Sequence, residues 1–253
     1  GMRLFQNDIF IKEQPMIIQP EIGYLGIVCK EIEGILHFLM QAKIEPGNIN
    51  CIQISPTIQA TKSNFTRVHG GNLPRYFECF ENASKYHIIY DQIQSEQSAR
   101  FYKKRNRNII IEISEEIQVD SNYCWMTLGQ IKQLMKIDNL VNMDTRTVIS
   151  GLPFFSKNEN DIAALEEYFY DKPLFHSMFC TDLMESLTDV RYYINDYRMF
   201  QDTKVTEIPL NELIDWRINE YGIECCKKAD FMVKYYDITI EGREVHSWVQ
   251  PLF

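Results

Sequence analysis

The first half of the chain consists of short apolar runs separated by turn residues, a pattern that predicts strands joined by tight turns. Residues 15–47 contain several β-rich runs that are interrupted by three glycines. In residues 51–61 isoleucines alternate with polar residues, as in a half-buried strand, although Pro56 must interrupt the ladder of hydrogen bonds. We therefore expect a sheet built mainly from this half of the chain.

A further strand is predicted at residues 107–119. Its three consecutive isoleucines, Ile109, Ile110 and Ile111, leave no polar face, so we expect this strand to be buried on both sides and the sheet to be covered. A helix follows, with Thr127 as its N-cap and apolar residues at helical spacing behind it.

The second half changes character. Residues 158–200 are acidic and aromatic with helical spacing, and residues 230–253 return to strand-like runs. Glu241 and Gly242 are placed for a hairpin turn between two of these strands. We expect α/β architecture, with a helical segment between two strand-rich segments.

Composition narrows the class of protein. The 253 residues are 45% hydrophobic and 24% charged, and no apolar run approaches the roughly 20 residues that cross a bilayer. A net charge of -9 argues against a nucleic-acid-binding protein. The seven cysteines have no paired spacing, which favours reduced thiols, so we expect a soluble, cytoplasmic protein without a membrane partner or a metal site.

One short stretch runs against the acidic balance of the chain. Residues 98–108 carry five cations: Arg100, Lys103, Lys104, Arg105 and Arg107. Arginine forks grip phosphate oxygens in pairs, so this stretch is a candidate for binding a diphosphate. A solvated basic loop is the alternative, and the sequence leaves both open.

Several long strings of the sequence resemble the NDP-hexose 2,3-dehydratase family of deoxysugar biosynthesis. They are "LHFLMQAKIEPGNIN", "QISPTIQATKSNFTRVHGG", "QSEQSARFYKKRNRN", "WMTLGQI" and "LVNMDTRTV". The resemblance runs from about residue 16 to residue 153 and resumes at residue 205. Members of that family resemble tandem duplications of a Nudix-like unit, whereas this chain carries one copy and the start of a second.

The resemblance implies a Nudix-like mixed sheet flanked by helices. We expect a nucleotide-sugar-binding core at residues 1–153, a helical segment at 154–203 and a start-of-repeat segment at 204–253 that completes a core. If the last segment is swapped between subunits, the chain forms a homodimer. The alternative is a monomer whose tail folds back on itself.

The family resemblance also implies a reaction, the elimination of the C2 hydroxyl of a nucleoside diphosphate 4-keto-6-deoxyhexose, most simply dTDP-linked. The ketone acidifies the C3 proton, so the reaction needs a base, an acid for the C2 oxygen and donors for the enolate. It moves no net electrons, so we expect no cofactor. Residues 127–140 contain no glutamate, which argues against Nudix-type hydrolysis of the diphosphate.

Two residues are the candidates for proton transfer. His69 lies before a glycine pair and titrates near neutral pH, and Glu45 precedes Pro46, which favours an extended backbone. Structural alternatives are a turn-capping histidine for His69 and a turn carboxylate paired with Lys43 or Lys62 for Glu45. His37 and His87 lie in apolar runs, and we expect both in the core.

The remaining candidates pair with sugar hydroxyls or phosphates through amide, hydroxyl, carboxylate or guanidinium groups. They are Gln41, Gln53, Thr57, Gln59, Thr61, Ser63, Asn64, Thr66, Glu96, Arg105, Arg107, Asp144 and Arg146. Some of the hydroxyls and amides can instead close backbone turns, and Asp144 can instead form an ion pair with Arg146. Phe65 stands where the family usually has tyrosine, so this position cannot donate a proton. A non-catalytic nucleotide-sugar-binding protein is therefore the alternative to the dehydratase, with a diphosphate hydrolase as the weaker option.

Overall fold

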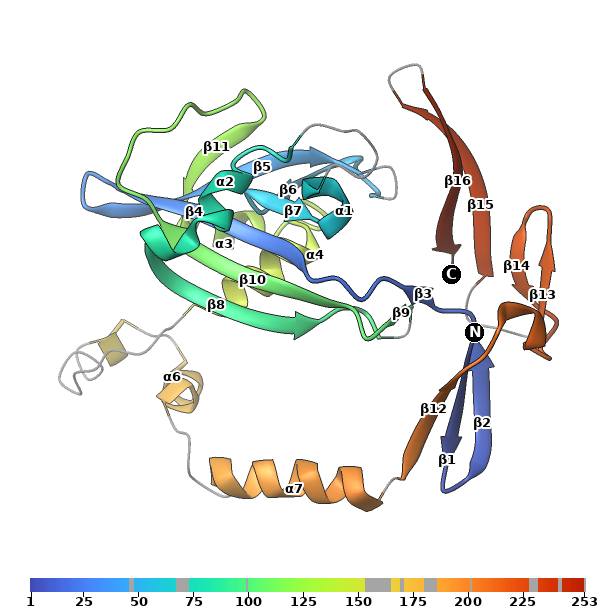
Figure 1. Cartoon of the computed structure of the whole chain (residues 1–253). Coiled ribbons are helices and arrows are strands. Elements are labelled where there is room, and N and C mark those ends of the chain that lie inside the picture. The colour runs from blue at the N-terminus through green and yellow to red at the C-terminus, as the bar shows by residue number, and fades with distance from the viewer. Residues whose placement is uncertain are drawn as a thin grey trace. The chain divides into compact units, whose positions relative to one another are not determined.

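The computed structural model describes residues 1–45, 48–66, 73–98, 100–152, 165–168, 171–179, 186–200, 202–227, 232–240 and 243–252 (Figure 1). Contacts divide the chain into two compact units. We call Ile18–Ser98 with Lys103–Phe154 the sheet unit, and Gly1–Ile17 with Ala99–Tyr102 and Phe155–Phe253 the terminal unit.

The sheet unit is built on a seven-stranded mixed sheet. Its strands are β4 (Gly23–Ile32), β5 (Ile35–Ile44), β6 (Ile52–Ser55), β7 (Ile58–Ala60), β8 (His87–Ser95), β10 (Arg105–Glu112) and β11 (Tyr123–Thr127). The order is β11-β5-β4-β10-β8, with β6 beside β5 and β7 beside β4. Only β10 and β4 run parallel, and the other pairs are antiparallel. The predicted mixed sheet is confirmed.

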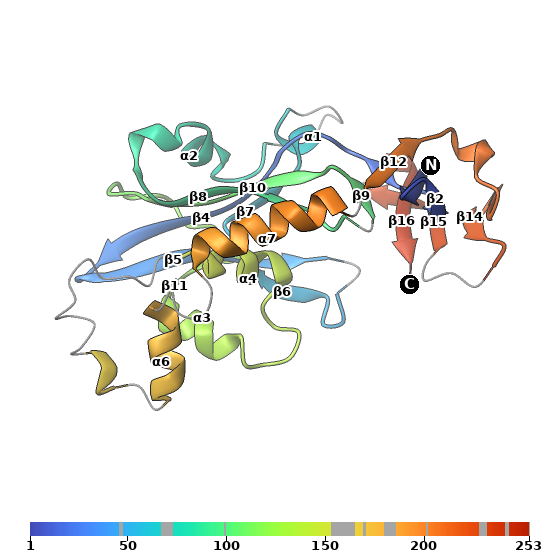
Figure 2. The same ribbon diagram turned by 90° about the horizontal axis from the view of Figure 1, so that it is seen from below.

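Helices cover both faces of this sheet (Figure 2). They are α1 (Lys62–Phe65), α2 (Phe77–Glu81), η1 (Ala83–Lys85), α3 (Leu128–Leu134) and α4 (Met143–Ser150). On the α2 side, Phe80 packs in a buried cluster with Ile109 and Ile111. On the α4 side, Val148 shares a buried cluster with Ile110. The isoleucine run of β10 is thus buried on both faces, as its composition predicted.

The two central strands of the sheet, β4 and β5, diverge along their length. They pair only between residues 29–32 and 35–38. Beyond that point β7 pairs with β4 at residues 24–26, and β6 pairs with β5 at residues 41–44. Short strands thus take over the backbone hydrogen bonds that β4 and β5 no longer exchange. The amide-rich segment of the sequence supplies both short strands, so its polar side chains lie where the sheet divides.

The described residues of the terminal unit form two small antiparallel sheets and two helices. Strands β1 (Met2–Gln6), β2 (Ile9–Gln14) and β12 (Thr203–Glu207) form one sheet, and β13 (Trp216–Asn219), β14 (Gly222–Cys225), β15 (Met232–Ile240) and β16 (Arg243–Leu252) form the other. The helices are α6 (Lys172–Phe179) and α7 (Leu187–Phe200), followed by η2 (Leu210–Glu212). A short pair, β3 (Ile17–Ile18) with β9 (Phe101–Tyr102), completes the strands.

Buried Glu13 connects the N-terminal strands to the backbone of Ile214 and Asp215. Its carboxylate accepts hydrogen bonds from the backbone of Ile214 and, at 2.8 Å, of Asp215, and it forms an ion pair of 2.9 Å with Arg3. Burial alone raises the pKa of Glu13, but these donors outweigh it and hold the pKa below its ordinary value. The first strands of the chain are therefore fixed to a segment two hundred residues later.

Local predictions have mixed outcomes. Thr127 caps α3 with the full capping box, completed by Gln130, so that prediction is confirmed. The prediction that His87 lies in the core is wrong, because its side chain is 72% exposed and contacts Glu112 at 2.8 Å. The hairpin residues Glu241 and Gly242 lie outside the described residues. None of the described helices is both long and apolar enough to span a bilayer.

Candidate functional site

Glu45 is one of several polar side chains that lie where β4 and β5 diverge. Its carboxylate forms an ion pair of 3.0 Å with Lys43 and accepts a hydrogen bond of 3.1 Å from Gln59 and one of 3.3 Å from Asn48. Glu45 follows β5 directly, Gln59 lies in the middle of β7, and the two strands belong to opposite arms of the divided sheet. The Glu45 carboxylate is therefore held from both arms.

The N-terminus of α4 connects to this network through Asn142. The side chain of Asn142 caps the helix, accepting 2.8 Å from the backbone N–H of Thr145. Its Nδ2 donates to Ser55 Oγ at 3.0 Å and to Gln59 Oε1 at 3.1 Å. One buried amide thus fixes the start of α4 against both short strands.

Asp144 lies in the first turn of α4, next to these amides. It is half-buried, and burial raises its pKa to about 6, with the charges of Glu96 and Glu45 acting in the same direction and that of Lys43 opposing them. A carboxyl group with this pKa accepts or releases a proton near neutral pH. The sequence suggested Asp144 only as a binding residue, yet its surroundings suit proton transfer.

Glu96 approaches the same place from the end of β8. Its carboxylate accepts a hydrogen bond from Asn106 Nδ2, and Asn106 is buried on β10. Two residues along β10 lies Asn108, which is 1% exposed and whose side-chain nitrogen and oxygen have no partner in the described part of the chain. We call Lys43, Glu45, Gln59, Glu96, Asn106, Asn142 and Asp144 the polar cluster.

The basic stretch is divided by the alternation of β10. Arg105 and Arg107 share the face of Ile109, which belongs to the α2 side, whereas Asn106 and Asn108 share the face of Ile110 on the α4 side. Arg105 is exposed, and Lys104 is buried. The structure therefore does not bring the two predicted arginines to the face that carries Asn106.

Arg107 is already engaged by protein groups. Its guanidinium binds both carboxylate oxygens of Asp91, at 2.8 and 2.6 Å, and lies 5.7 Å from the ring centre of Tyr24. The hydrogen bonds with Asp91 have the largest effect on the pKa of Arg107, and they raise it although burial acts in the opposite direction. Lys104 Nζ donates to the backbone oxygen of Glu21 at 2.7 Å, and burial lowers its pKa although Glu21 and Glu96 oppose this.

The other predicted binding residues are dispersed. Gln53 donates to the backbone of Asn139 at 2.8 Å, Thr66 to that of Lys62 at 2.8 Å, and Arg146 to those of Met135 at 2.8 Å and Val141 at 3.2 Å. Gln41 and Thr61 are half-buried, Thr57 is buried, and Ser63 and Asn64 lie in α1. Asp144 and Arg146 do not form the ion pair that was the alternative. His69 lies outside the described residues.

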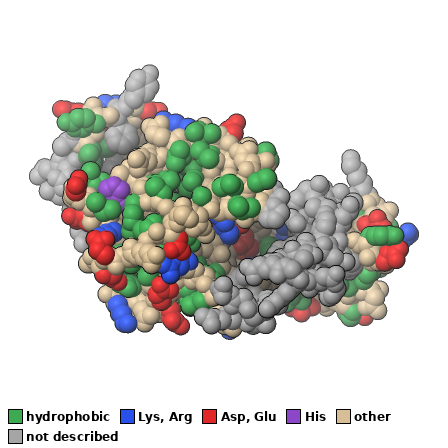
Figure 3. All heavy atoms as spheres, turned by 90° about the horizontal axis from the view of Figure 1, so that it is seen from above, with side chains coloured by type: hydrophobic (Ala, Val, Ile, Leu, Met, Phe, Trp, Pro, Cys, Tyr) green, Lys and Arg blue, Asp and Glu red, His purple; other side chains and the backbone are tan. Residues whose placement is uncertain are grey.

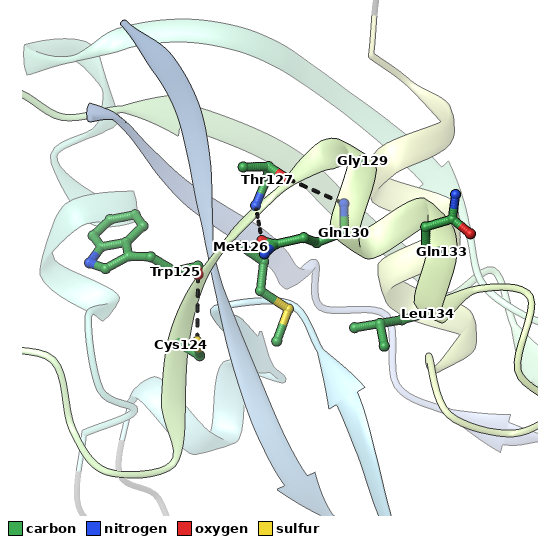
Figure 4. Close-up of a pocket in the computed structure, with 8 residues that line it drawn as sticks. All are labelled: Cys124, Trp125, Met126, Thr127, Gly129, Gln130, Gln133 and Leu134. Carbon is green, nitrogen blue, oxygen red and sulfur yellow. Dashed lines mark hydrogen bonds between the residues drawn. The ribbon is translucent and has the colours of Figure 1, made fainter. Parts of the chain in front are cut away.

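A hollow of about 610 Å³ lies elsewhere on the sheet unit, along β11 and α3 (Figure 4). Cys124, Trp125, Met126, Leu134 and their neighbours line it. Its lining carries no carboxylate, histidine or cation, so it lacks the groups for acid–base chemistry. We therefore assign the chemistry to the polar cluster.

Two further properties bear on the ligand. Among the residues that the structure describes, no three His, Cys, Asp or Glu side chains are grouped closely enough to hold a metal ion. Figure 3 shows acidic and basic side chains interspersed on the face it displays, rather than gathered by sign.

Comparison with known proteins gives close relatives. The family model described as NDP-hexose 2,3-dehydratase matches residues 6–152 and 187–253. Three curated relatives, each named dTDP-4-dehydro-6-deoxy-alpha-D-glucopyranose 2,3-dehydratase, come from Saccharopolyspora spinosa, Amycolatopsis orientalis and Streptomyces violaceoruber. They are 41%, 39% and 38% identical over 94%, 95% and 94% of this chain, but over 49%, 46% and 52% of their own lengths. The chain spans about half the length of the curated relatives it matches.

Solved structures give weaker similarity. The Ap4A hydrolase of C. elegans aligns with a TM-score of 0.33 at 10% identity, over 52% of this chain and 94% of that chain. A chain of the complex between the C-terminal domain of mouse MUTYH and human PCNA aligns with a TM-score of 0.31 at 10% identity, over 60% and 99%. With scores this low, the Nudix-like fold stays a prediction.

Proposed function

Since the chain belongs to the NDP-hexose 2,3-dehydratase family, we propose that it is a lyase that removes water from a nucleoside diphosphate 4-keto-6-deoxyhexose. The names of the curated relatives favour a dTDP-linked sugar as substrate. The observation that carries the proposal is the polar cluster, where three carboxylates and three amides meet at the start of α4.

The chemistry of the substrate explains why such a cluster is needed. The C4 ketone acidifies the C3 proton, so a carboxylate of suitable pKa can remove it. The C2 oxygen leaves as water once a second group donates a proton to it. Amide and ammonium donors near the C4 oxygen stabilise the enolate that forms. The polar cluster contains all three kinds of group.

We propose Glu45 and His69 as proton-transfer residues. Support for Glu45 comes from its contacts, because Lys43, Gln59 and Asn48 hold its carboxylate in one orientation. For His69, support comes from the sequence alone. Which of the two acts on carbon and which on oxygen is left to the variants described below.

The remaining contacts are proposed by chemistry. We propose Gln59, Glu96 and Asp144 as contacts to sugar hydroxyls. The wider set from the amide-rich segment is proposed from the sequence alone and consists of Gln41, Gln53, Thr57, Thr61, Ser63, Asn64 and Thr66. The proposal that Arg105 and Arg107 bind the diphosphate rests on the sequence alone, because both lie on the α2 side of β10 and Arg107 already binds Asp91. Arg146 is proposed as a weaker contact to the ligand, because its guanidinium already donates to backbone oxygens.

We further propose a homodimer and a cytoplasmic location. The dimer follows from the half-length match, and residues 204–253 are the segment that would dock on the partner. In the structure β12 pairs with β1 of its own chain, which is the arrangement of the monomeric alternative. Size-exclusion chromatography with light scattering at micromolar concentration separates the two, and a monomer would eliminate the dimer.

One assay tests the proposed activity. The protein is incubated with dTDP-4-dehydro-6-deoxyglucose, and the nucleotide sugar is analysed by mass spectrometry. Loss of one water from the sugar supports the dehydratase. Unchanged ligand that nevertheless binds in calorimetry supports the non-catalytic binding protein, and release of thymidine monophosphate supports the hydrolase.

Variants then assign the roles. Glu45→Gln keeps the size of the side chain and one acceptor oxygen but cannot carry a proton, so we expect water loss to slow by about 10²- to 10⁴-fold. The matched control is Glu116→Gln, whose carboxylate is 95% exposed at the surface. His69→Ala is measured alongside. If both Glu45→Gln and His69→Ala turn over like the control, these assignments are removed.

A further inference from the structure

Helix α4 packs over the face of β10 that carries Asn106, Asn108 and Ile110. Val148 and Ile110 belong to the same buried cluster. One helical turn before Val148, about 5.4 Å, lies Asp144, and two strand residues before Ile110, about 6.6 Å, lies Asn108. The electrostatic effect of Glu96 on Asp144 agrees with this packing, because Glu96 is bound by Asn106 on the same strand face. Asp144 and Asn108 therefore lie on the same side of the sheet, each a short step from the cluster that Val148 and Ile110 share.

Asn108 gives an independent sign of a ligand. Its side chain is almost completely buried, yet neither its oxygen nor its nitrogen has a hydrogen-bond partner among the described residues. A buried amide is normally paired, since an unpaired one destabilises the fold. Asn106, on the same face, uses its amide to hold Glu96. A polar ligand between β10 and the first turn of α4 would supply the partners that Asn108 lacks.

The three carboxylates near this point are held differently. Glu45 is bound by Lys43 and Gln59, and Glu96 is bound by Asn106. Within the described part of the chain, the Asp144 carboxylate has no hydrogen bond, and the charged groups that act on it are Glu96, Lys43 and Glu45. Asp144 is therefore the one of these three carboxylates that no hydrogen bond from the described residues holds.

We propose, on the basis of the dehydratase function above, that Asp144 is the base that takes the C3 proton of the sugar, beside an Asn108 amide that donates to an oxygen of the same sugar. The electron pair of the C3–H bond moves toward the C4 oxygen to give the enolate, and it returns to form the C2=C3 double bond as the C2–O bond breaks. The hydroxyl leaves as water with a proton from the proton donor proposed above. Asp144 and that donor then exchange their protons with solvent.

The pH dependence follows from the sign of the charge on Asp144. A base works when ionised, and burial and Glu96 raise the pKa of Asp144 to about 6. The value of kcat/KM for the unmodified protein should therefore fall about tenfold per pH unit below pH 6 and level off above it. An acid in this position would give the opposite limb, with activity lost above pH 6.

The test compares Asp144→Asn with Asp138→Asn, an exposed control in the same segment. Each full-length protein is given dTDP-4-dehydro-6-deoxyglucose in deuterated buffer, and exchange at C3 and water loss are followed by NMR and mass spectrometry. Binding of thymidine diphosphate is measured by calorimetry, and folding is checked by thermal melting. We expect Asp144→Asn to bind and fold but to lose both reactions by about 10²-fold or more, while the control stays within about twofold.

The outcomes separate the two proposals. If the unmodified protein neither loses water nor exchanges C3, the dehydratase function fails and Asp144 falls with it. If the unmodified protein turns over and Asp144→Asn stays within about threefold of it, only the assignment of Asp144 is overturned. Should Asp144→Asn not fold, the pH profile of the unmodified protein decides, and a profile flat between pH 5 and 8 overturns the assignment.

Discussion

Two buried polar side chains on opposite sides of the sheet in the sheet unit, Thr57 and Asn108, differ in their hydrogen bonding. On the α2 side, buried Thr57 accepts from the backbone of Val28 at 2.9 Å and donates to that of Leu39 at 2.5 Å, and both of these residues belong to the apolar cluster there. On the α4 side, buried Asn108 has no partner in the described part of the chain. The α2 side thus has the character of a closed core, and the α4 side that of a binding site.

This contrast teaches where stability and function reside. A buried hydroxyl with both hydrogen bonds made holds diverging strands together. An unpaired buried amide and a carboxylate of raised pKa lower the stability of the apoprotein and remain open to a ligand. We expect Phe80→Ala and Thr57→Val on the α2 side to lower the free energy of unfolding. We expect Asp144→Asn and Asn108→Leu on the α4 side to raise it while lowering activity. The predictions below test this from the largest effect to the smallest.

Phe80→Ala should give the largest loss of stability. The ring is 1% exposed and lies so close to β4 that a Cβ on Gly26 would come within 2.3 Å of it. Removing it leaves a cavity, so we expect the free energy of unfolding to fall by about 3–5 kcal/mol. Urea denaturation measures this, and a loss below about 1 kcal/mol would contradict the assignment of this side as the closed core.

Thr57→Val should also destabilise the protein, although valine has nearly the same shape. The substitution leaves the N–H of Val28 and the carbonyl of Leu39 without their buried partner. We expect a loss of about 1–3 kcal/mol in urea denaturation. An unchanged midpoint would show that the paired hydroxyl does not hold β4 and β5.

Asp144→Asn should stabilise the folded protein at neutral pH. Burial and Glu96 raise the pKa of Asp144 from 3.8 to about 6, so the folded state binds a proton more tightly than the unfolded state and its stability falls as the pH rises through this window. The full shift corresponds to about 3 kcal/mol, which partial exposure reduces to about 1–2 kcal/mol. The gain should be present at pH 8 and shrink toward pH 4. A gain that is independent of pH would refute this origin.

Asn108→Leu should have the smallest effect on stability. Leucine replaces an unpartnered amide by apolar atoms of similar branching, so we expect a change within about 1 kcal/mol, in the stabilising direction. The matched comparison is Thr57→Val, where a paired group is lost. A loss above about 2 kcal/mol for Asn108→Leu would show that the amide has a partner and would remove the contrast between the two sides.

Local sequence signals predicted the elements of the sheet unit well. The isoleucine run of β10 has no polar face and is buried on both sides, and Thr127 forms its capping box with a residue three positions away. Both features depend only on neighbouring residues, so the sequence contains all that determines them. The alternation of Asn106, Asn108 and Ile110 was the available sign of a polar group on a buried face.

Distant pairings could not be read in the same way. Arg107 binds Asp91 because β8 and β10 pair in a particular register. The charge of Glu96 raises the pKa of Asp144 because α4 packs on β10. Neither register is written in the local pattern of either segment. Asn142 could have been found as an N-cap, but its contacts with Ser55 and Gln59 depend on where the two short strands lie. For the same reason Asp144 was predicted to bind rather than to transfer a proton.

The central claim is that the polar cluster at the start of α4 holds the sugar. The most direct measurement is a crystal structure of the chain with a dTDP-linked 6-deoxyhexose. The account predicts the sugar ring against Asp144 and Gln59, with C3 within about 3.5 Å of an Asp144 oxygen. A ring bound in the hollow between β11 and α3, with Asp144 and Asn108 unchanged and without a ligand, would contradict it.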